Sequence, residues 1–79
     1  MTNEQLYKDV FITTFNVEDN HILLNLEYNT IDEWDSIGHM QLVAALETTF
    51  DVMLDMDDII DLSSFSKGKE ILGKYNIQF

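Results

Sequence analysis

Residues 34–50 read WDSIGHMQLVAALETTF, and this stretch carries the clearest helical pattern in the chain. Leu42, Leu46 and Phe50 recur at intervals of four residues, which places them on one side of a helix. A second apolar row lies beside them and consists of Ile37, Met40 and Val43. Asp35 is a residue type that commonly caps a helix N-terminus. We therefore predict a helix whose interior spans residues 37–50 and whose apolar stripe faces the core.

The residues before this helix predict another helix and a long loop. Thr2 followed by Gln5 resembles a capping box, and residues 3–15 place Tyr7, Phe11 and Phe15 on one row. Leu6 and Val10 lie on the adjacent row. Residues 16–35 have irregular apolar spacing and several turn-forming asparagines, which favours a loop held against the core. A short strand over residues 22–28 is an alternative interpretation, but the sequence offers no second strand to pair with it.

The residues after it predict two more helices. Residues 55–61 favour a short helical piece that presents Met56, Ile59 and Ile60. Ser63 or Ser64 can cap a last helix that uses Phe65, Leu72 and Tyr75. Gly68 and Gly73 each weaken that helix by about 1 kcal/mol relative to alanine. The predicted fold is an all-α four-helix bundle in one domain, residues 1–79, with three longer helices, a short third helix and a long first loop.

The composition excludes several classes of function. The 79 residues carry a formal net charge of −11 and contain no cysteine. Of the 15 acidic residues, 14 lie in residues 1–66, where Lys8 is the only base. Such a surface repels nucleic acid and anionic membranes and favours basic protein partners. The chain lacks thiolate metal sites and cysteine nucleophiles, and neither export nor membrane insertion is indicated, so we expect a cytoplasmic protein.

Ser36 and His39 share a helical face, with Asp35 beside them, which invites a search for a nucleophilic triad. The indication is weak, because a hydrolase also needs an oxyanion hole and a substrate cleft. We therefore expect no catalytic residue and no enzymatic activity. We also expect no metal site, since His21 and His39 lack ligand spacing and residues 55–66 lack the glycine and glutamate of a calcium loop.

The stretch from Trp34 to Phe50 resembles the modification site and second helix of acyl carrier proteins. The resemblance rests on the triplet Asp35-Ser36-Ile37, the helix ending Leu46-Glu47-x-x-Phe50, the acidic short helix that follows and the total length. It implies that Ser36 is an attachment point. A magnesium-dependent phosphopantetheinyl transferase would move 4′-phosphopantetheine from coenzyme A to its hydroxyl, and Asp35 would help the transferase and its metal engage.

The resemblance also implies what the chain would carry and contact. The thiol of the arm would hold acyl groups as thioesters for acyl-loading and acyl-transfer enzymes with basic patches, as in fatty acid or polyketide biosynthesis, and the carrier would be a monomer. The partner-docking residues would be Ile37, Met40, Gln41, Glu47, Asp51 and Asp57. A further set of residues is expected first of all to form the core: Met40, Val43, Leu46, Ile59 and Ile60. In the family, the equivalent apolar positions either part to shelter an acyl chain or stay closed while the cargo lies outside.

Three residues depart from the common pattern of fatty-acid carriers. Gly38, His39 and Gln41 stand at positions that we take to be on the surface and that are often acidic or hydroxylated in those carriers. These departures favour a freestanding, pathway-specific carrier. Trp34 before the Asp-Ser pair resembles many such carriers, and the alternative interpretation is that it is only an aromatic plug at the bundle end. Two alternatives remain: an aminoacyl carrier of the peptidyl or D-alanyl kind, and an acidic adaptor in which Ser36 is only a helix cap.

Overall fold

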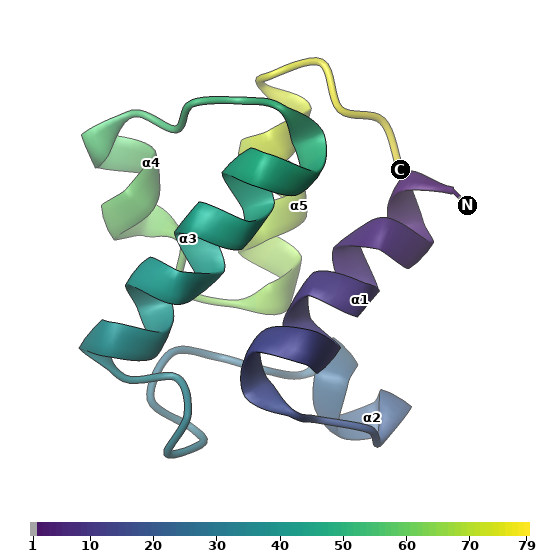
Figure 1. Ribbon diagram of the computed structural model, residues 1–79, viewed down its shortest axis with the longest axis vertical. Helices are drawn as coiled ribbons and strands as arrows, with labels where there is room; N and C mark the ends of the chain where they lie inside the picture. Colours follow the sequence, from purple (N-terminus) through teal and green to yellow (C-terminus); the bar gives the residue numbers. More distant parts are fainter. Residues whose placement is uncertain (1) are drawn as a thin grey trace.

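Five helices organise residues 2–79, the part of the chain that the computed structural model describes (Figure 1). They are α1 (Asn3–Phe15), α2 (Asn20–Leu24), α3 (Ser36–Phe50), α4 (Met56–Asp61) and α5 (Phe65–Gly73). Within this range there is no strand, and the one extended pairing is an isolated antiparallel bridge between Glu27 and Ser64. The chain is mostly helical, with a radius of gyration of 11.3 Å.

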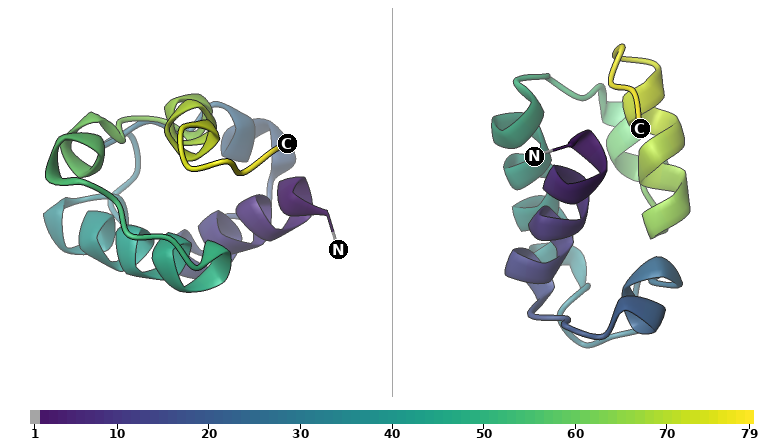
Figure 2. Two further views of the ribbon diagram at one scale, coloured as in Figure 1. Left: turned by 90° about the horizontal axis from the view of Figure 1, so that it is seen from above. Right: turned by 90° about the vertical axis from the view of Figure 1, so that its right-hand side faces the viewer.

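The helices enclose one core. α1 packs along α3, and Figure 2 shows these two helices on one side with α4 and α5 on the other. Phe11 lies at the centre, where its ring contacts Phe65 at 5.1 Å and Trp34 at 5.7 Å between centroids. Phe15 stacks on Trp34 at 5.2 Å. Trp34 is fully buried, so this aromatic cluster joins α1, the first residue of α5 and the segment that leads into α3.

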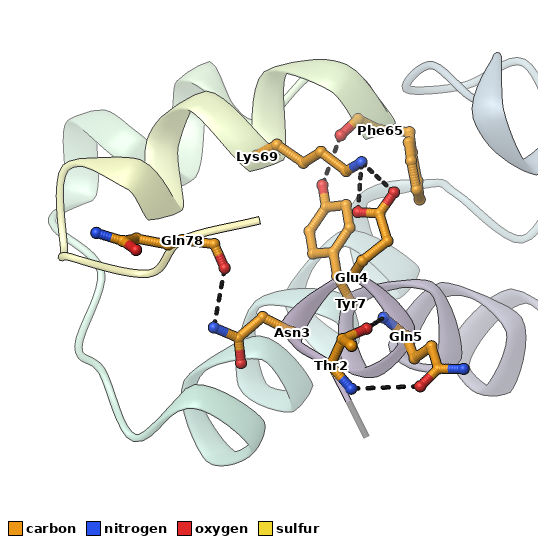
Figure 3. Close-up of polar contacts among 8 residues, drawn as sticks. All are labelled: Thr2, Asn3, Glu4, Gln5, Tyr7, Phe65, Lys69 and Gln78. Carbon is orange, nitrogen blue, oxygen red and sulfur yellow. Dashed lines mark hydrogen bonds and ion pairs between the residues drawn. The ribbon is translucent and has the colours of Figure 1, made fainter.

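Polar contacts hold α1 against α5 and the C-terminal segment (Figure 3). The Tyr7 hydroxyl donates a hydrogen bond of 2.6 Å to the carbonyl oxygen of Phe65. The Lys69 Nζ donates to Glu4 Oε1 at 2.7 Å, and the Asn3 side chain donates to the carbonyl oxygen of Gln78 at 3.0 Å. These contacts place the two ends of the described chain side by side.

The structure confirms the local signals for helix ends. Thr2 and Gln5 form the predicted capping box at the start of α1. Asp35 caps α3, and the Ser64 hydroxyl accepts a hydrogen bond from the Lys67 N–H at the start of α5. The short helix is also confirmed, with Asp55 as its N-cap residue.

The predicted loop over residues 16–35 is wrong in one part, because it contains α2. Asp19 caps this single turn by accepting hydrogen bonds from the N–H groups of His21 and Ile22. The rest of the prediction is confirmed, since Leu23 and Leu26 are buried and hold the segment against the core. The alternative strand over residues 22–28 is not formed. The last helix ends at Gly73, before Tyr75, which packs at the edge of the core.

Candidate functional site

Ser36 is the first residue of α3, and its side chain is exposed. The helix begins here because the Asp35 carboxylate accepts a hydrogen bond of 2.8 Å from the N–H of Gly38. The carbonyl oxygen of Asp35 accepts the first helical bond, from the N–H of His39, also at 2.8 Å. The arrangement presents a hydroxyl to solvent at the positive end of a 15-residue helix, directly after a carboxylate.

Gly38 has no side chain, and this lets the preceding loop pack closely against α3. A Cβ at this position would lie 1.9 Å from the carbonyl oxygen of Glu33, a distance at which backbone must move. The same Cβ would lie 3.3 Å from the ring of Phe15 on α1. Gly38 is therefore buried, and our expectation that it is a surface position is wrong. The sequence signal was ambiguous because a helical glycine marks either an exposed site or a close contact.

His39 is also not the surface residue that we expected, because it links three parts of the fold. The buried Trp34 indole N–H donates to His39 Nδ1 at 3.0 Å, and His39 Nε2 lies 2.7 Å from the carbonyl oxygen of Ile59. An indole N–H is only a donor, so Nδ1 accepts and Nε2 carries the proton that it donates to Ile59. Both ring nitrogens are thus engaged, and neither is available to the Ser36 hydroxyl.

A pocket of about 280 Å³ lies between α3 and α4, one helical turn from Ser36. We call it the α3–α4 pocket, and its lining residues are Tyr28, His39, Ile59, Ile60, Leu62 and Ser63. The Tyr28 ring packs edge-on to His39 at 5.5 Å between centroids. Sequence reasoning identified Ile59 and Ile60 but missed Tyr28, Leu62 and Ser63, since a loop aromatic and a serine after a helix carry no periodic signal that would bring them to α3.

The predicted acyl-chain or core set is only partly buried. Val43 and Leu46 are buried and Ile59 is half-buried, as expected. Met40 and Ile60 are wrong as interior residues, because 55% and 70% of their surfaces are exposed. Ile37 is likewise 70% exposed and does not belong to the core stripe of α3. The predicted row of Leu42, Leu46 and Phe50 does face the core, so the prediction is wrong only on the side of the stripe that carries Ile37 and Met40.

The predicted docking residues lie on two helices. Ser36, Met40 and Glu47 share one face of α3, since they lie within about 40° of each other at 100° per residue. Gln41 is exposed on another side of α3, about 100° from Met40, Asp51 is exposed as the C-cap of this helix, and Asp57 is exposed on α4. Glu47 is half-buried, and its carboxylate accepts a hydrogen bond of 2.9 Å from the N–H of Leu54. That carboxylate therefore also holds the segment between α3 and α4.

Asp58 is the acidic residue whose place the sequence did not reveal. It is buried and accepts hydrogen bonds from Lys74 Nζ and, at 2.5 Å, from the Tyr75 hydroxyl. These hydrogen bonds lower the pKa of Asp58, and the same contacts raise the pKa values of Lys74 and Tyr75. Nothing in the run of acids from Asp51 to Asp61 distinguishes Asp58, because its partners lie 16 and 17 residues away in the chain.

No group of three or more metal-ligating side chains gathers anywhere in residues 2–79. None of the helices in this range is both long enough and apolar enough to span a bilayer. Comparison with models of protein families, with curated proteins and with solved structures finds no match to this chain.

Proposed function

We propose that the protein is a carrier of acyl groups, held as thioesters on a 4′-phosphopantetheine arm attached to Ser36. The observation that carries the proposal is an exposed serine hydroxyl at the first position of a long helix, directly after an aspartate. In this proposal α1, α3, α4 and α5 are the helices of a four-helix bundle, and α2 is one turn added to the first loop. The chain itself performs no catalysis.

The residues around Ser36 suit such a group. A phosphodiester on the hydroxyl would lie at a helix N-terminus, where N–H groups without helical partners and the helix dipole favour negative charge by about 0.3–1 kcal/mol. The Asp35 carboxylate is already capping Gly38, so its position relative to Ser36 is held for the transferase and its magnesium. When bound, the arm supplies the thiol that the sequence lacks.

Two features beside Ser36 support a carrier over a serine hydrolase. Both nitrogens of His39 are engaged with Trp34 and Ile59, so the neighbouring histidine does not activate the hydroxyl. Ile37 and Met40 expose apolar surface next to Ser36, the acidic Asp35 lies beside it, and the exposed Asp51 caps the opposite end of the same helix. Such a surface suits transient docking by cytoplasmic loading and transfer enzymes with basic patches.

Modification by a transferase tests the proposal. The protein is incubated with coenzyme A, magnesium and a broad-specificity phosphopantetheinyl transferase, and its intact mass is measured. We expect the wild type and a Ser63→Ala control, which removes another exposed serine, to gain the mass of one phosphopantetheine. We expect Ser36→Ala to gain none.

The same experiment separates the carrier from the acidic adaptor. A wild type that gains no mass, or a Ser36→Ala variant that gains the same mass as wild type, would refute the proposal and leave Ser36 as a helix-start residue. If the arm is added, the intact mass of protein purified from its native host distinguishes an acyl cargo from an aminoacyl one.

A further inference from the structure

Ser36 lies on a segment whose backbone is held on both sides of it. Before it, the Trp34 N–H donates to the carbonyl oxygen of Ile31 at 3.1 Å, and the Trp34 carbonyl oxygen accepts from the N–H of Asn29 at 3.0 Å. After it, the first turn of α3 is bonded to the cap residue Asp35. The position of the exposed Ser36 side chain is therefore set by its neighbours on both sides.

One side-chain bond closes this segment across Ser36. The Trp34 indole N–H donates to His39 Nδ1 at 3.0 Å, five residues along the chain. The two ring planes differ by 16° and their centroids lie 6.3 Å apart, so the rings meet edge to edge. The N–H bond and the nitrogen lone pair each lie in the plane of their own ring, and this arrangement aligns them. The bond therefore ties the residue before the Asp-Ser pair to the first turn of α3.

Both rings are anchored independently of this bond. The Trp34 side chain is fully buried, and its ring packs on Phe11 and Phe15 of α1. The other ring nitrogen of His39 donates to the carbonyl oxygen of Ile59 at 2.7 Å. A hydrogen bond between two groups that are already held costs little conformational entropy, so it restrains the residues between them. Through this bond the buried aromatic core restrains an exposed serine.

We propose that the Trp34–His39 hydrogen bond positions Ser36 for modification, and that Trp34 and His39 are positioning residues of the phosphopantetheine site. The bond keeps residues 35–38 in one arrangement, so a transferase meets the Ser36 hydroxyl and the Asp35 carboxylate already placed. Without the bond, the start of α3 frays, and only the fraction of molecules with an ordered first turn binds productively. This inference rests on the proposed function, because the positioning serves transfer to Ser36.

Two substitutions at His39 separate the bond to Trp34 from the bond to Ile59. In His39→Asn, the side-chain oxygen takes the place of Nδ1 and can accept from the indole, but no donor reaches Ile59. In His39→Gln, the amide nitrogen takes the place of Nε2 and can donate to Ile59, but the acceptor beside the indole is lost. Glutamine is the better helix former, so helix propensity favours the variant that we expect to be impaired.

Steady-state kinetics of a broad-specificity phosphopantetheinyl transferase with each variant measure the effect. We expect His39→Gln to raise the KM for the carrier and so lower kcat/KM about three- to tenfold, with kcat and the KM for coenzyme A nearly unchanged. His39→Asn should stay within about twofold of the wild type. Val10→Ala is the control for lost stability, because Val10 is buried on α1 and takes no part in the bond. Its kcat/KM should also stay within about twofold of the wild type.

Hydrogen exchange followed by NMR gives a second readout that needs no transferase. Trp34 is the only tryptophan in the chain, so its indole N–H gives a single resonance. We expect this proton to exchange at least about threefold faster in His39→Gln than in the wild type or in His39→Asn. The Gly38 N–H, which bonds to Asp35, should follow the same order, because the first turn of α3 loosens when the bond is lost.

Equal kcat/KM in His39→Asn and His39→Gln would overturn this inference, whether both match the wild type or both fall below it. A loss in Val10→Ala as large as that in His39→Gln would also overturn it, since stability and not position would then govern the rate. Both results leave Ser36 as the modified residue. A wild type that gains no phosphopantetheine refutes the proposed function and this inference together.

Discussion

Replacing Gly68 with alanine is expected to destabilise the protein, although the same change at an unconstrained helical glycine is stabilising. Helix propensity alone favours alanine by about 1 kcal/mol. A Cβ on Gly68, however, would lie 2.0 Å from the Tyr7 hydroxyl oxygen and 3.0 Å from Cδ1 of Leu62. Gly68 is buried, so in Gly68→Ala either α1 and α5 must separate or the Tyr7 ring must move.

The cost follows from what Tyr7 does in this position. Its side chain is fully buried, and burial, reinforced by the charge of Glu4, raises the pKa of Tyr7, so the hydroxyl stays protonated and donates to the Phe65 carbonyl. Losing that bond leaves buried polar groups unpaired, at a cost of about 1–3 kcal/mol. Overpacking adds about 1–3 kcal/mol. After the gain in propensity, Gly68→Ala should lower the free energy of unfolding by about 1–5 kcal/mol.

Urea unfolding followed by far-UV circular dichroism measures this change, and the chain supplies a matched control in the same helix. A Cβ on Gly73 meets no atom within 4 Å, so Gly73→Ala should leave stability unchanged or raise it by up to about 1 kcal/mol. Removing the obstructing hydroxyl with Tyr7→Phe should make Gly68→Ala at least about 1 kcal/mol less damaging than in the wild type. If Gly68→Ala stabilises the protein as Gly73→Ala does, the steric argument is wrong.

Two further changes probe the contacts of α4. Acidification should lower the free energy of unfolding of the wild type more than that of Asp58→Asn. The reason is that hydrogen bonds from Lys74 and Tyr75 lower the folded-state pKa of Asp58. The stabilisation by Asp58 is therefore complete above the ordinary aspartate pKa and is lost as the pH falls through the lowered pKa. Urea midpoints between about pH 7 and pH 3 measure this, and parallel curves for the two proteins would contradict it. His39→Phe should lower the free energy of unfolding by about 2–4 kcal/mol, because the hydrogen bond to the Ile59 carbonyl is lost and the buried indole N–H of Trp34 is left unpaired. Urea denaturation of His39→Phe and of the exposed control His21→Phe checks this. A difference under about 0.5 kcal/mol between their free energies of unfolding would count against it.

Much of the helical framework was predictable because its signals are local. Thr2 with Gln5, Asp35 and Ser64 each cap a helix through a bond to a residue three positions away, and a single sequence reveals such spacings. α2 was missed because one turn is too short to develop a period. Its cap, Asp19, was the available signal.

At the candidate site, the sequence predicted the position and exposure of Ser36, but it predicted the burial of the neighbouring residues much less well. Ser36 stands at an exposed helix start, as its place after Asp35 indicates. Its surroundings were not readable: Met40 and Ile60 were expected inside and are exposed, while Gly38 was expected outside and is buried. Periodicity defines which residues share a helix face, but the packing partner decides which face turns inward.

The sequence by itself determined where α1, α3 and α4 begin, the excess of acidic charge and the presence of a serine after an aspartate at a helix start. These follow from bonds between near neighbours and from composition. Only the tertiary structure decided that Asp58, alone in its acidic run, is drawn inside by Lys74 and Tyr75, and that His39 joins Trp34 to Ile59. Those contacts form between residues that the chain brings together only when the aromatic core closes, so no local pattern records them.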